Sequence, residues 1–360
     1  MALQWAAWVA WEEWAVTKTP VALKKMKNPD SEIQSRGFFI FRSENSITKR
    51  SASFLNFKNF MNKNSNLFIL IILGITWSSF AIFTKIAAAD LSPYFVAFSR
   101  LALGGALLYS ICLIQRKKVF LPRNFKHYAI VGFFNSAFPF TLFALASRAV
   151  DSGIAAILDG TVPMFEVLIS IFFLKRFVDK NAILGVVFGL VGIVITYFDG
   201  SITADITWSY SLAVIAILAA TASYAGASLY INAKCKNIDA MTLAAGSVLS
   251  VALLLSPSLF FADFSLIDAK VATSLLGLGL LCTGIAYVLY FKLIAEEGPR
   301  VAVSVVLLIP VFGTIFGAMF LGEVITMSKI IGCVTILVSM KFILNLSKQN
   351  FFKSKNAPAV

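Results

Sequence analysis

Charged residues are scarce in this sequence. They make up only 14% of the chain, whereas apolar residues make up 59% and the mean hydropathy is +0.83. Soluble globular proteins average roughly 25% charged and about 45–50% apolar residues. A water-soluble fold cannot bury this much apolar surface, so most of the chain must be solvated by lipid. The composition predicts an integral membrane protein.

Residues that serve metal and redox chemistry are also few. His127 is the single histidine, and the four cysteines are scattered without a CxxC pair. The HExxH, GxSxG and P-loop patterns are missing, which argues against a zinc hydrolase, a serine hydrolase and an ATP-driven pump. We therefore expect no metal, no cofactor and no enzymatic activity. An acid pair formed by Asp159 and Glu166 leaves an intramembrane enzyme as a remote alternative.

Long apolar runs dominate what is present. Each is about 20 residues long, the length that a helix needs to cross a bilayer. None shows the alternation of a membrane β-barrel, so we expect an all-α integral membrane protein with ten transmembrane helices. The expected spans are 67–88, 93–114, 127–147, 152–174, 181–198, 210–232, 240–261, 271–294, 301–321 and 327–346.

The connections between these spans differ in charge. The second, fourth and sixth connections hold most of the loop lysines and arginines, whereas the first and fifth (ADLSP and DGSITADITW) hold none. Because basic loops stay in the cytoplasm, the even connections and both termini are predicted to be cytoplasmic. The net charge of +13 follows this loop pattern and the first 66 residues rather than one stripe, so we expect no nucleic-acid partner.

The chain repeats itself at an offset of 147 residues. Pro163 matches Pro310, Phe165 matches Phe312, and the Gly that ends ILG at 185 matches the Gly that ends IIG at 332. Two five-helix units are therefore expected, 67–200 and 208–346. An extension of residues 1–66 precedes them and a cytoplasmic tail of 347–360 follows.

An odd number of helices in each unit makes the second unit cross the membrane upside down. Inverted repeats of this kind place a substrate site near the midplane, between the units. Pro163 and Pro310 each remove a helical hydrogen bond, which lipid tolerates where protein or a wet cavity satisfies the gap. They are predicted either to form hinges beside such a cavity or to kink their helices for packing alone.

Several segments together resemble the EamA repeats of the drug/metabolite transporter superfamily. They are GITWSSFAIFTKIA from Gly74, SPYFVAFSRLALGG from Ser92, the ILGVVFGLVGIVI segment and PVFGTIFGAMFLGE, which ends at Glu323. The first unit has LKR in place of the final LGE, so symmetry supports no role for Glu323, and the second unit has no clear equivalent of Arg100. The resemblance implies a ten-helix secondary carrier of the bacterial cytoplasmic (inner) membrane, which moves small metabolites, amino acids or drugs, often outward.

Two acids lie inside the fourth span. A carboxylate at the bilayer centre costs roughly 2.5–3.5 kcal/mol, so such residues usually face a cavity or a partner. Asp159 and Glu166 are seven residues apart, which on a continuous helix places them on one stripe with Pro163. The matching stripe of the ninth span consists of Val306, Pro310, Gly313 and Gly317. The acids are predicted either to bind a proton or a cationic solute group, or to form a structural pair with Arg100.

Other polar and aromatic residues are further candidates for a binding site. Trp77 and Tyr224 are repeat partners that either stack on a solute or pack within the protein. Asn135, Thr283 and Tyr287 offer hydrogen-bonding groups near mid-depth, and such groups often serve only to join helices.

Glycine pairs mark close helix contacts. Gly185 with Gly189, and Gly313 with Gly317, form GxxxG patterns that pack helices within one chain or between subunits. The sequence leaves a homodimer open for this reason.

The first sixty residues do not match the rest. They begin with four tryptophans at every third position and continue into a polar, basic stretch, whereas Met61 opens a natural lead into the first span. We expect the extension to be disordered or to reflect a misassigned start, and not to be a secretory signal.

These features together predict a secondary-active transporter of small metabolites that works by alternating access. Intramembrane acids favour amino-acid-like, cationic or amphiphilic solutes, and export is the expected direction. Protons are a candidate coupling ion. The alternatives are a proton-independent facilitator or exchanger of another metabolite class and, more remotely, a channel or an intramembrane enzyme.

Overall fold

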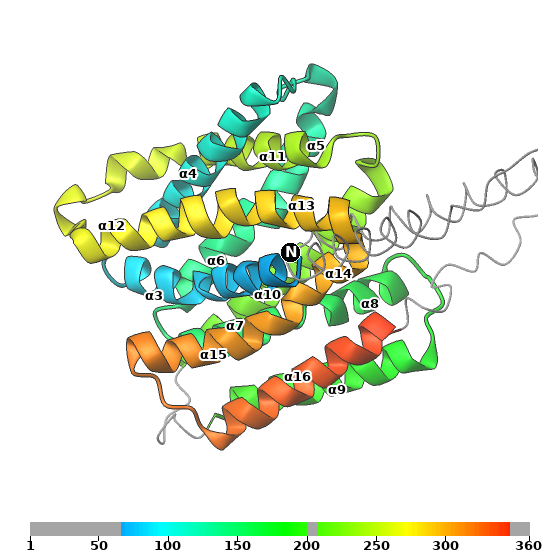
Figure 1. The fold of residues 1–360 in the computed structure, drawn as a ribbon. Coiled ribbons are helices and arrows are strands. Elements are labelled where there is room, and N and C mark those ends of the chain that lie inside the picture. The colour runs from blue at the N-terminus through cyan, green and yellow to red at the C-terminus, as the bar shows by residue number, and fades with distance from the viewer. Residues whose placement is uncertain (1–65, 200–207, 346–360) are drawn as a thin grey trace, which may run out of the picture.

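The computed structural model describes residues 66–199 and 208–345, and every regular element in these two ranges is a helix (Figure 1). Nine of the described helices are long and apolar enough to cross a membrane, and the bent pair α7 and α8 forms a tenth candidate span. The all-helical fold and the approximate count of ten spans are thus confirmed. The predicted extension, apart from Asn66, and the predicted tail lie outside the described residues.

The helices of the first unit follow the predicted spans within a few residues. They are the span Asn66–Asp90, whose second part is α3 (Phe80–Asp90), then α4 (Pro93–Ile114), η1 (Pro122–Asn124), α5 (Phe125–Gly132), η2 (Phe133–Ala137), α6 (Phe138–Ala146), α7 (Ser152–Asp159), α8 (Val162–Phe172) and α9 (Lys180–Tyr197).

The second unit repeats this order. It contains α10 (Trp208–Lys234), α11 (Ala240–Leu255), η3 (Ser256–Phe261), η4 (Phe264–Leu266), α12 (Ala269–Leu276), η5 (Gly277–Ile285), α13 (Ala286–Glu297), α14 (Pro299–Val303), η6 (Ser304–Leu307), α15 (Leu308–Leu321) and α16 (Met327–Asn345).

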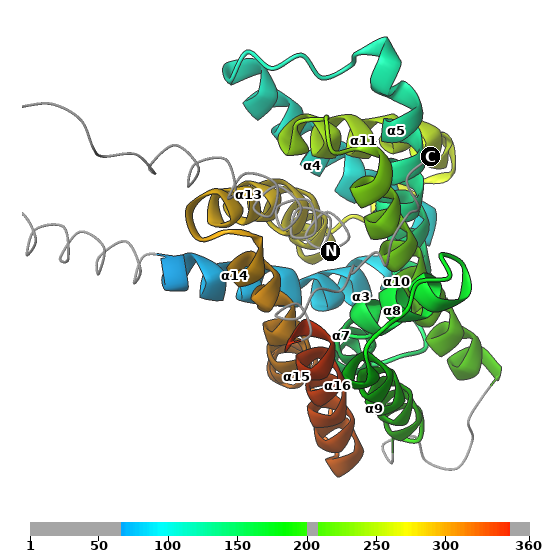
Figure 2. The same cartoon turned by 90° about the vertical axis from the view of Figure 1, so that its right-hand side faces the viewer.

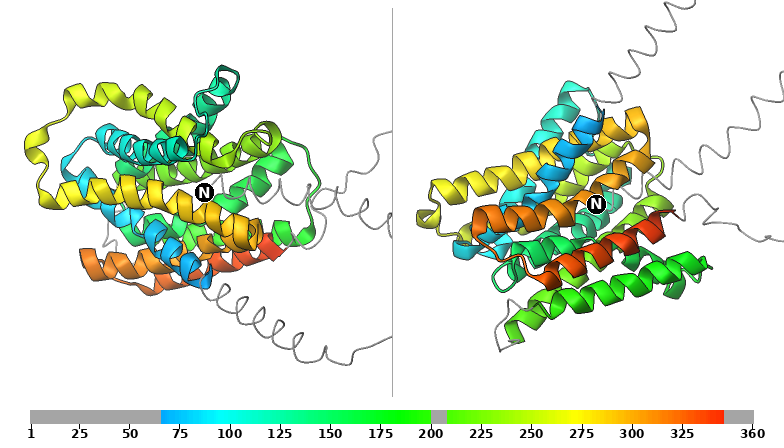
Figure 3. Two further views of the ribbon diagram at one scale, coloured as in Figure 1. Left: turned by 45° about the horizontal axis from the view of Figure 1, so that its top comes forward. Right: turned by 60° about the horizontal axis from the view of Figure 1, so that its bottom comes forward.

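Helices that are related by the repeat pack in pairs. The offset of 147 residues separates the first residues of α4 and α11, and likewise those of α9 and α16. Figures 1 and 2 show α4 beside α11 at one side of the molecule and α9 beside α16 at the other, and Figure 3 shows the second pair from two more directions. The remaining helices lie between these two pairs.

The fourth span is broken rather than continuous. Helix α7 ends at Asp159, α8 begins at Val162, and the two are bent by 41°. Pro163 lies in the first turn of α8, and Pro310 lies in the first turn of α15, directly after the 3-10 segment η6. A proline fits the first turn, where its missing N–H has no helical partner to lose. Pro163 therefore follows a break in the fourth span, whereas Pro310 follows a 3-10 segment within a continuous ninth span. Whether the two prolines act as hinges or only shape the packing stays a prediction.

Two π-helical segments occupy matched places in the repeat. The offset of 147 carries η2, at residues 133–137, onto 280–284 within η5. Segments with π geometry are rare and often lie at functional sites. This pair makes the third and eighth spans candidates for the walls of a binding site.

The glycine pairs pack helices of the same chain. A Cβ on Gly185 would lie 2.6 Å from Ile343 of α16 and 3.1 Å from the carbonyl oxygen of Ser339. A Cβ on Gly313 of α15 would likewise overlap the side chain of Ala156 on α7. Of the two alternatives left by the sequence, the GxxxG faces therefore serve contacts inside the monomer.

The outer surface is strongly apolar, as a lipid environment requires. Helix α9 alone exposes the large side chains Leu184, Val187, Phe188, Leu190, Val191 and Val194. Soluble monomers rarely expose contiguous apolar patches of this extent. The exposed face of α9 is therefore a membrane-facing surface.

Candidate functional site

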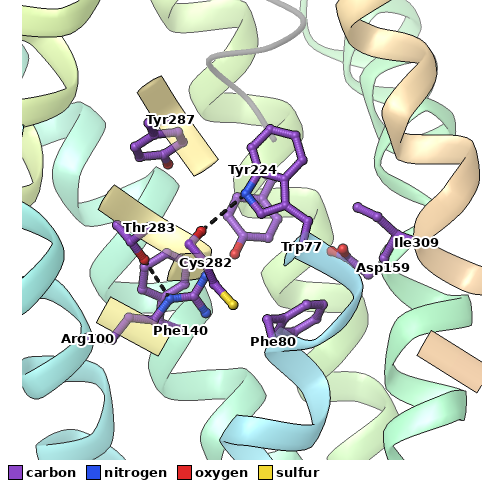
Figure 4. A pocket seen from close by; sticks show the side chains of 10 residues that line it. All are labelled: Trp77, Phe80, Arg100, Phe140, Asp159, Tyr224, Cys282, Thr283, Tyr287 and Ile309. Carbon is purple, nitrogen blue, oxygen red and sulfur yellow. Dashed lines mark hydrogen bonds between the residues drawn. The ribbon is translucent and has the colours of Figure 1, made fainter. Parts of the chain in front are cut away.

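A small cavity lies between the two halves of the chain (Figure 4). Its walls come equally from both units, and its volume is about 40 Å³. The lining residues are Trp77, Phe80, Arg100, Phe140 and Asp159 from the first unit and Tyr224, Cys282, Thr283, Tyr287 and Ile309 from the second.

Arg100 of α4 is buried at this cavity and is held by two neighbours. Its Nε donates a hydrogen bond to Oγ1 of Thr283 at 3.1 Å, and Thr283 in turn donates to the carbonyl oxygen of Leu278. The guanidinium carbon lies 3.7 Å from the centroid of the Phe140 ring. A cation over an aromatic face is stabilised by the ring quadrupole. These contacts orient the guanidinium without neutralising its charge.

Asp159 is the last residue of α7, immediately before the helix break. Its side chain is 2% exposed, and its Oδ1 has no hydrogen-bond partner among the described residues. Arg100 bonds to Thr283 instead of Asp159, so the structural pair that the sequence left open does not form. A buried carboxylate oxygen without a partner is costly, and such a group in a native protein calls for an explanation. Its position at the cavity supplies one.

Four aromatic rings of the wall form two repeat-related pairs. Trp77 and Tyr224 are separated by the offset of 147, and so are Phe140 and Tyr287. The indole Nε1 of Trp77 donates to the carbonyl oxygen of Cys282 at 3.2 Å, which joins the first span to η5 (Figure 4). The two units therefore contribute equivalent aromatic surfaces to one cavity.

Glu166 does not line this cavity. It lies on α8 beyond the break, where its Oε1 is buried without a hydrogen bond and its side chain interacts with Ser228 of α10. The prediction of a single stripe with Asp159 assumed a continuous helix, and the 41° bend removes that basis. The two acids therefore lie in different surroundings.

Asn135 is the other predicted site residue that lies outside the lining. It belongs to η2, is 1% exposed and lies beside Tyr287, and neither polar atom of its amide makes a hydrogen bond with the described residues. Thr283 and Tyr287, by contrast, line the cavity. That they make polar contacts to a solute stays a prediction.

Of the predicted hinge residues, Pro163 and Pro310 lie close to the break, whereas Gly313 and Gly317 pack along α7. A Cβ on Gly160 would lie 3.2 Å from Cγ of Pro310, and Pro310 follows the lining residue Ile309. Gly317 leaves room for the side chains of Ser152 and Glu323. Whether these residues, Pro163 and Gly313 act as hinges stays a prediction.

Sequence reasoning missed several lining residues. Phe80, Phe140, Cys282 and Ile309 were not singled out, and Arg100 was considered only as a structural partner. The offset of 147 offered a signal for two of them, because it carries Phe140 onto Tyr287 and Asn135 onto Cys282. Phe80 and Ile309 carried no distinguishing signal in so apolar a chain. Within the described residues, no three His, Cys, Asp or Glu side chains are grouped as a metal site.

Comparison of this chain with known proteins identifies its fold and its family. Residues 64–198 and 211–345 each match the EamA-like transporter family. A protein of known crystal structure aligns with a TM-score of 0.57 at 18% identity, over 79% of this chain and 98% of that chain, which supports the fold alone.

Relatives with similar sequences are named as transporters. YoaV of Bacillus subtilis (strain 168), named an uncharacterized transporter, is 27% identical over 274 residues, which cover 74% of this chain and 91% of that protein. YedA of Escherichia coli (strain K12), named an uncharacterized inner membrane transporter, is 29% identical over 277 residues, or 72% of this chain and 84% of that protein. Since both repeats match and the spans are in place, this chain is a multi-pass membrane protein that belongs to the EamA-like transporter family.

Proposed function

We propose that this protein is a secondary-active carrier, working by alternating access, for small solutes that carry both a cationic and an anionic group, as amino acids do. The observation that carries the proposal is the placement of Arg100 and Asp159 on one cavity without an ion pair between them. Each buried charge is costly when it lacks a partner. A solute with a carboxylate for Arg100 and an ammonium group for Asp159 would offset both costs at once.

The lining favours a solute with an apolar or aromatic part. The rings of Trp77, Phe80, Tyr224 and Tyr287 surround the two charged groups. Secondary carriers built from inverted repeats place their substrate sites at such an interface between units. The family and the relatives named as transporters support the coarser statement that the chain is a transporter.

The small cavity volume suits a closed state of the carrier. A cavity of about 40 Å³ exceeds the ~10–15 Å³ that one water needs, yet it is far below the size of binding pockets for small molecules, roughly 300–1,000 Å³. Solute entry therefore requires the walls to separate. Movement of α7 about the break at Gly160–Thr161 would widen the cavity beside Asp159.

Orientation, direction and coupling belong to the same proposal. The basic even-numbered connections support cytoplasmic termini in a bacterial inner membrane, and we propose export as the direction. Glu166 is proposed as the proton-binding group, because its carboxyl lies inside the membrane without a full set of partners. A facilitator or exchanger without proton coupling is the alternative.

Binding of matched probes to the purified protein tests the substrate class. Phenylalanine carries both charges, phenylalanine amide lacks the carboxylate, and 3-phenylpropionate lacks the ammonium group. We expect phenylalanine to raise the melting temperature most, since a ligand at 100 times its Kd adds about 2.7 kcal/mol of stability. Arg100→Gln should remove the preference for phenylalanine over phenylalanine amide. Asp159→Asn should remove the preference for phenylalanine over 3-phenylpropionate.

The control is Lys118→Gln, which changes an exposed loop charge and should keep all preferences. Saturable counterflow of the stabilising probe in proteoliposomes would then establish transport. The proposed substrate class fails if the two pocket variants rank the three probes as the unmodified protein does.

A further inference from the structure

A cluster of five charged residues joins the two units at one end of the molecule. We define the Glu323 cluster as Lys85, Asp151 and Asp199 of the first unit with Glu323 and Lys329 of the second. It lies where α3 ends, where α7 and α16 begin, and where α9 and α15 have just ended. No residue of the cluster lines the central cavity.

Four ion pairs connect these residues, and three of them cross the boundary between the units. Nζ of Lys85 lies 3.3 Å from Oδ1 of Asp151 and 3.0 Å from Oε1 of Glu323. Nζ of Lys329 lies 2.7 Å from Oδ2 of Asp151 and 3.6 Å from Oδ2 of Asp199. The Lys329 side chain is only 1% exposed, and its ammonium also donates to the carbonyl oxygen of Val324. Lys329 and Asp199 are almost fully buried, so removing one of them would leave an uncompensated charge at this boundary.

Glu323 also caps the helix that carries Asp159. Its Oε1 accepts the backbone N–H of Ser152 at 2.7 Å, and its Oε2 accepts that of Gly153 at 3.0 Å. These groups are two of the unpaired donors at the start of α7, where the helix dipole also favours an anion. Helix α7 has only eight residues and ends at Asp159. A carboxylate of the second unit thus fixes one end of a short helix whose other end lies at the cavity.

The repeat does not carry this cluster to the opposite end of the molecule. The offset of 147 carries the five positions onto Asn232, Gly298, Leu346, Arg176 and Ala182, which include no acid. The ion pair between Lys117 and Asp239 does join the units at that end, but both side chains are about a third or more exposed. Exposed pairs contribute little to stability. The repeat is therefore symmetric in its helices but asymmetric in the charges that join its ends.

We propose that the Glu323 cluster is the gate that closes the central cavity at this end of the molecule, and that Glu323 is a positioning residue for Asp159 through α7. The proposal rests on the carrier function proposed above. In a carrier with alternating access, the contacts that seal one end must break when the cavity opens to that side. Breaking this cluster would release both the joint between the units and the N-terminus of α7 in one step.

Labelling of the native cavity thiol tests this gate without any solute. Cys282 lines the cavity and is 1% exposed, so in a protein with the other three cysteines replaced by alanine it reports access to the cavity. The reagent is a membrane-impermeant maleimide, added to the face of the membrane that carries the α11–α12 connection. In a separate sample, Asp263→Cys places a cysteine in that connection, and its labelling identifies the face. Glu323→Gln and Lys329→Gln should each speed labelling of Cys282 from that face by about tenfold, which corresponds to about 1.4 kcal/mol lost from the closed state.

Three further results decide the outcome. Labelling from the opposite face should slow in the same variants, because a released gate shifts the population between the two access states. Glu323→Asp, which retains the charge, should restore part of the slow rate, and Asp239→Asn at the other end should leave the rate unchanged. Unaltered labelling in folded gate variants overturns the proposal, and so does faster labelling from both faces, since that indicates general loosening.

If Glu323→Gln or Lys329→Gln does not fold, Lys85→Gln takes its place. The Lys85 side chain is partly exposed, so removing its charge costs less folding stability. Failure of the probe-binding experiment with normal gating would count against the substrate class alone. Normal probe binding with unaltered labelling would count against the gate alone.

Discussion

At the scale of residues, three buried charges are accommodated in different ways. Arg100 is held by a hydroxyl and an aromatic face, and Lys329 by two carboxylates and a carbonyl oxygen. Asp159 has an oxygen without a hydrogen-bond partner among the residues that the structure describes. Because unpaired buried polar atoms are rare and costly, the residue that lacks a partner is the one expected to meet a ligand.

Asp151 gives a prediction about pH. Burial would raise the pKa of its carboxyl, but the hydrogen bond from Lys329 and the charges of Lys329 and Lys85 outweigh this effect and hold the pKa below its usual value of 3.8. A lowered pKa in the folded state contributes stability that is complete above the unfolded pKa and is lost as the pH falls through the folded one.

We expect Asp151→Asn to lower the free energy of unfolding at pH 7 by about 1–3 kcal/mol, less than the ~3–5 kcal/mol for a buried ion that loses every partner, because Asp199 remains. The difference from the unmodified protein should shrink as the pH falls below about 3.8. Melting curves in detergent across pH measure it. A difference that grows toward acid would contradict the assigned pairing.

At the scale of elements, breaks in helices matter more than their lengths. The fourth span is interrupted before Pro163, at Gly160–Thr161, and the ninth span changes to 3-10 geometry over η6, before Pro310. Non-helical backbone inside a membrane is tolerated only where protein or a cavity satisfies it. Asp159 directly precedes the break and Ile309 closely follows η6, and both residues line the cavity.

Close packing of α9 on α16 yields a prediction for its glycines. A Cβ on Gly189 would lie 2.6 Å from Sδ of Met164 and 3.1 Å from Oγ of Ser339, so Gly189→Leu overpacks this contact. We expect a loss of about 1–3 kcal/mol in stability. Gly226→Leu on α10 is the matched control, because nothing lies within 4 Å of a Cβ there. Equal melting temperatures for the two variants would show that the helices do not pack as described.

At the scale of the whole molecule, the two units share a backbone plan but differ in charge. The residues that match Arg100 and Asp159 in the second unit are Ser247 and Val306, so both charges at the cavity come from the first unit. The shared backbone plan is what the proposed exchange between two access states would use. In the carrier proposed here, the unequal charges would decide what binds and which end is held closed.

Proton coupling is a property at this scale, and Glu166 tests it. In proteoliposomes loaded with a transported probe, a pH gradient should drive probe accumulation, because a proton bound at Glu166 would cross with the change of access state. Glu166→Gln should abolish accumulation while leaving counterflow, which needs no net proton movement. Gradient-driven accumulation that is unchanged in this variant would eliminate Glu166 as the coupling group and favour the proton-independent exchanger.

The amino-acid sequence by itself determined the solvent, the spans and the duplication, because apolar run length, loop charge and a constant offset are local or additive properties of the chain. It also identified Trp77, Asp159, Tyr224, Thr283 and Tyr287, which line the cavity. Only the tertiary structure separated Glu166 from Asp159, since the break in the fourth span is a small change of backbone direction that composition does not encode. The same is true of Glu323, whose partners on α3 and α7 are 238 and 171 residues away along the chain.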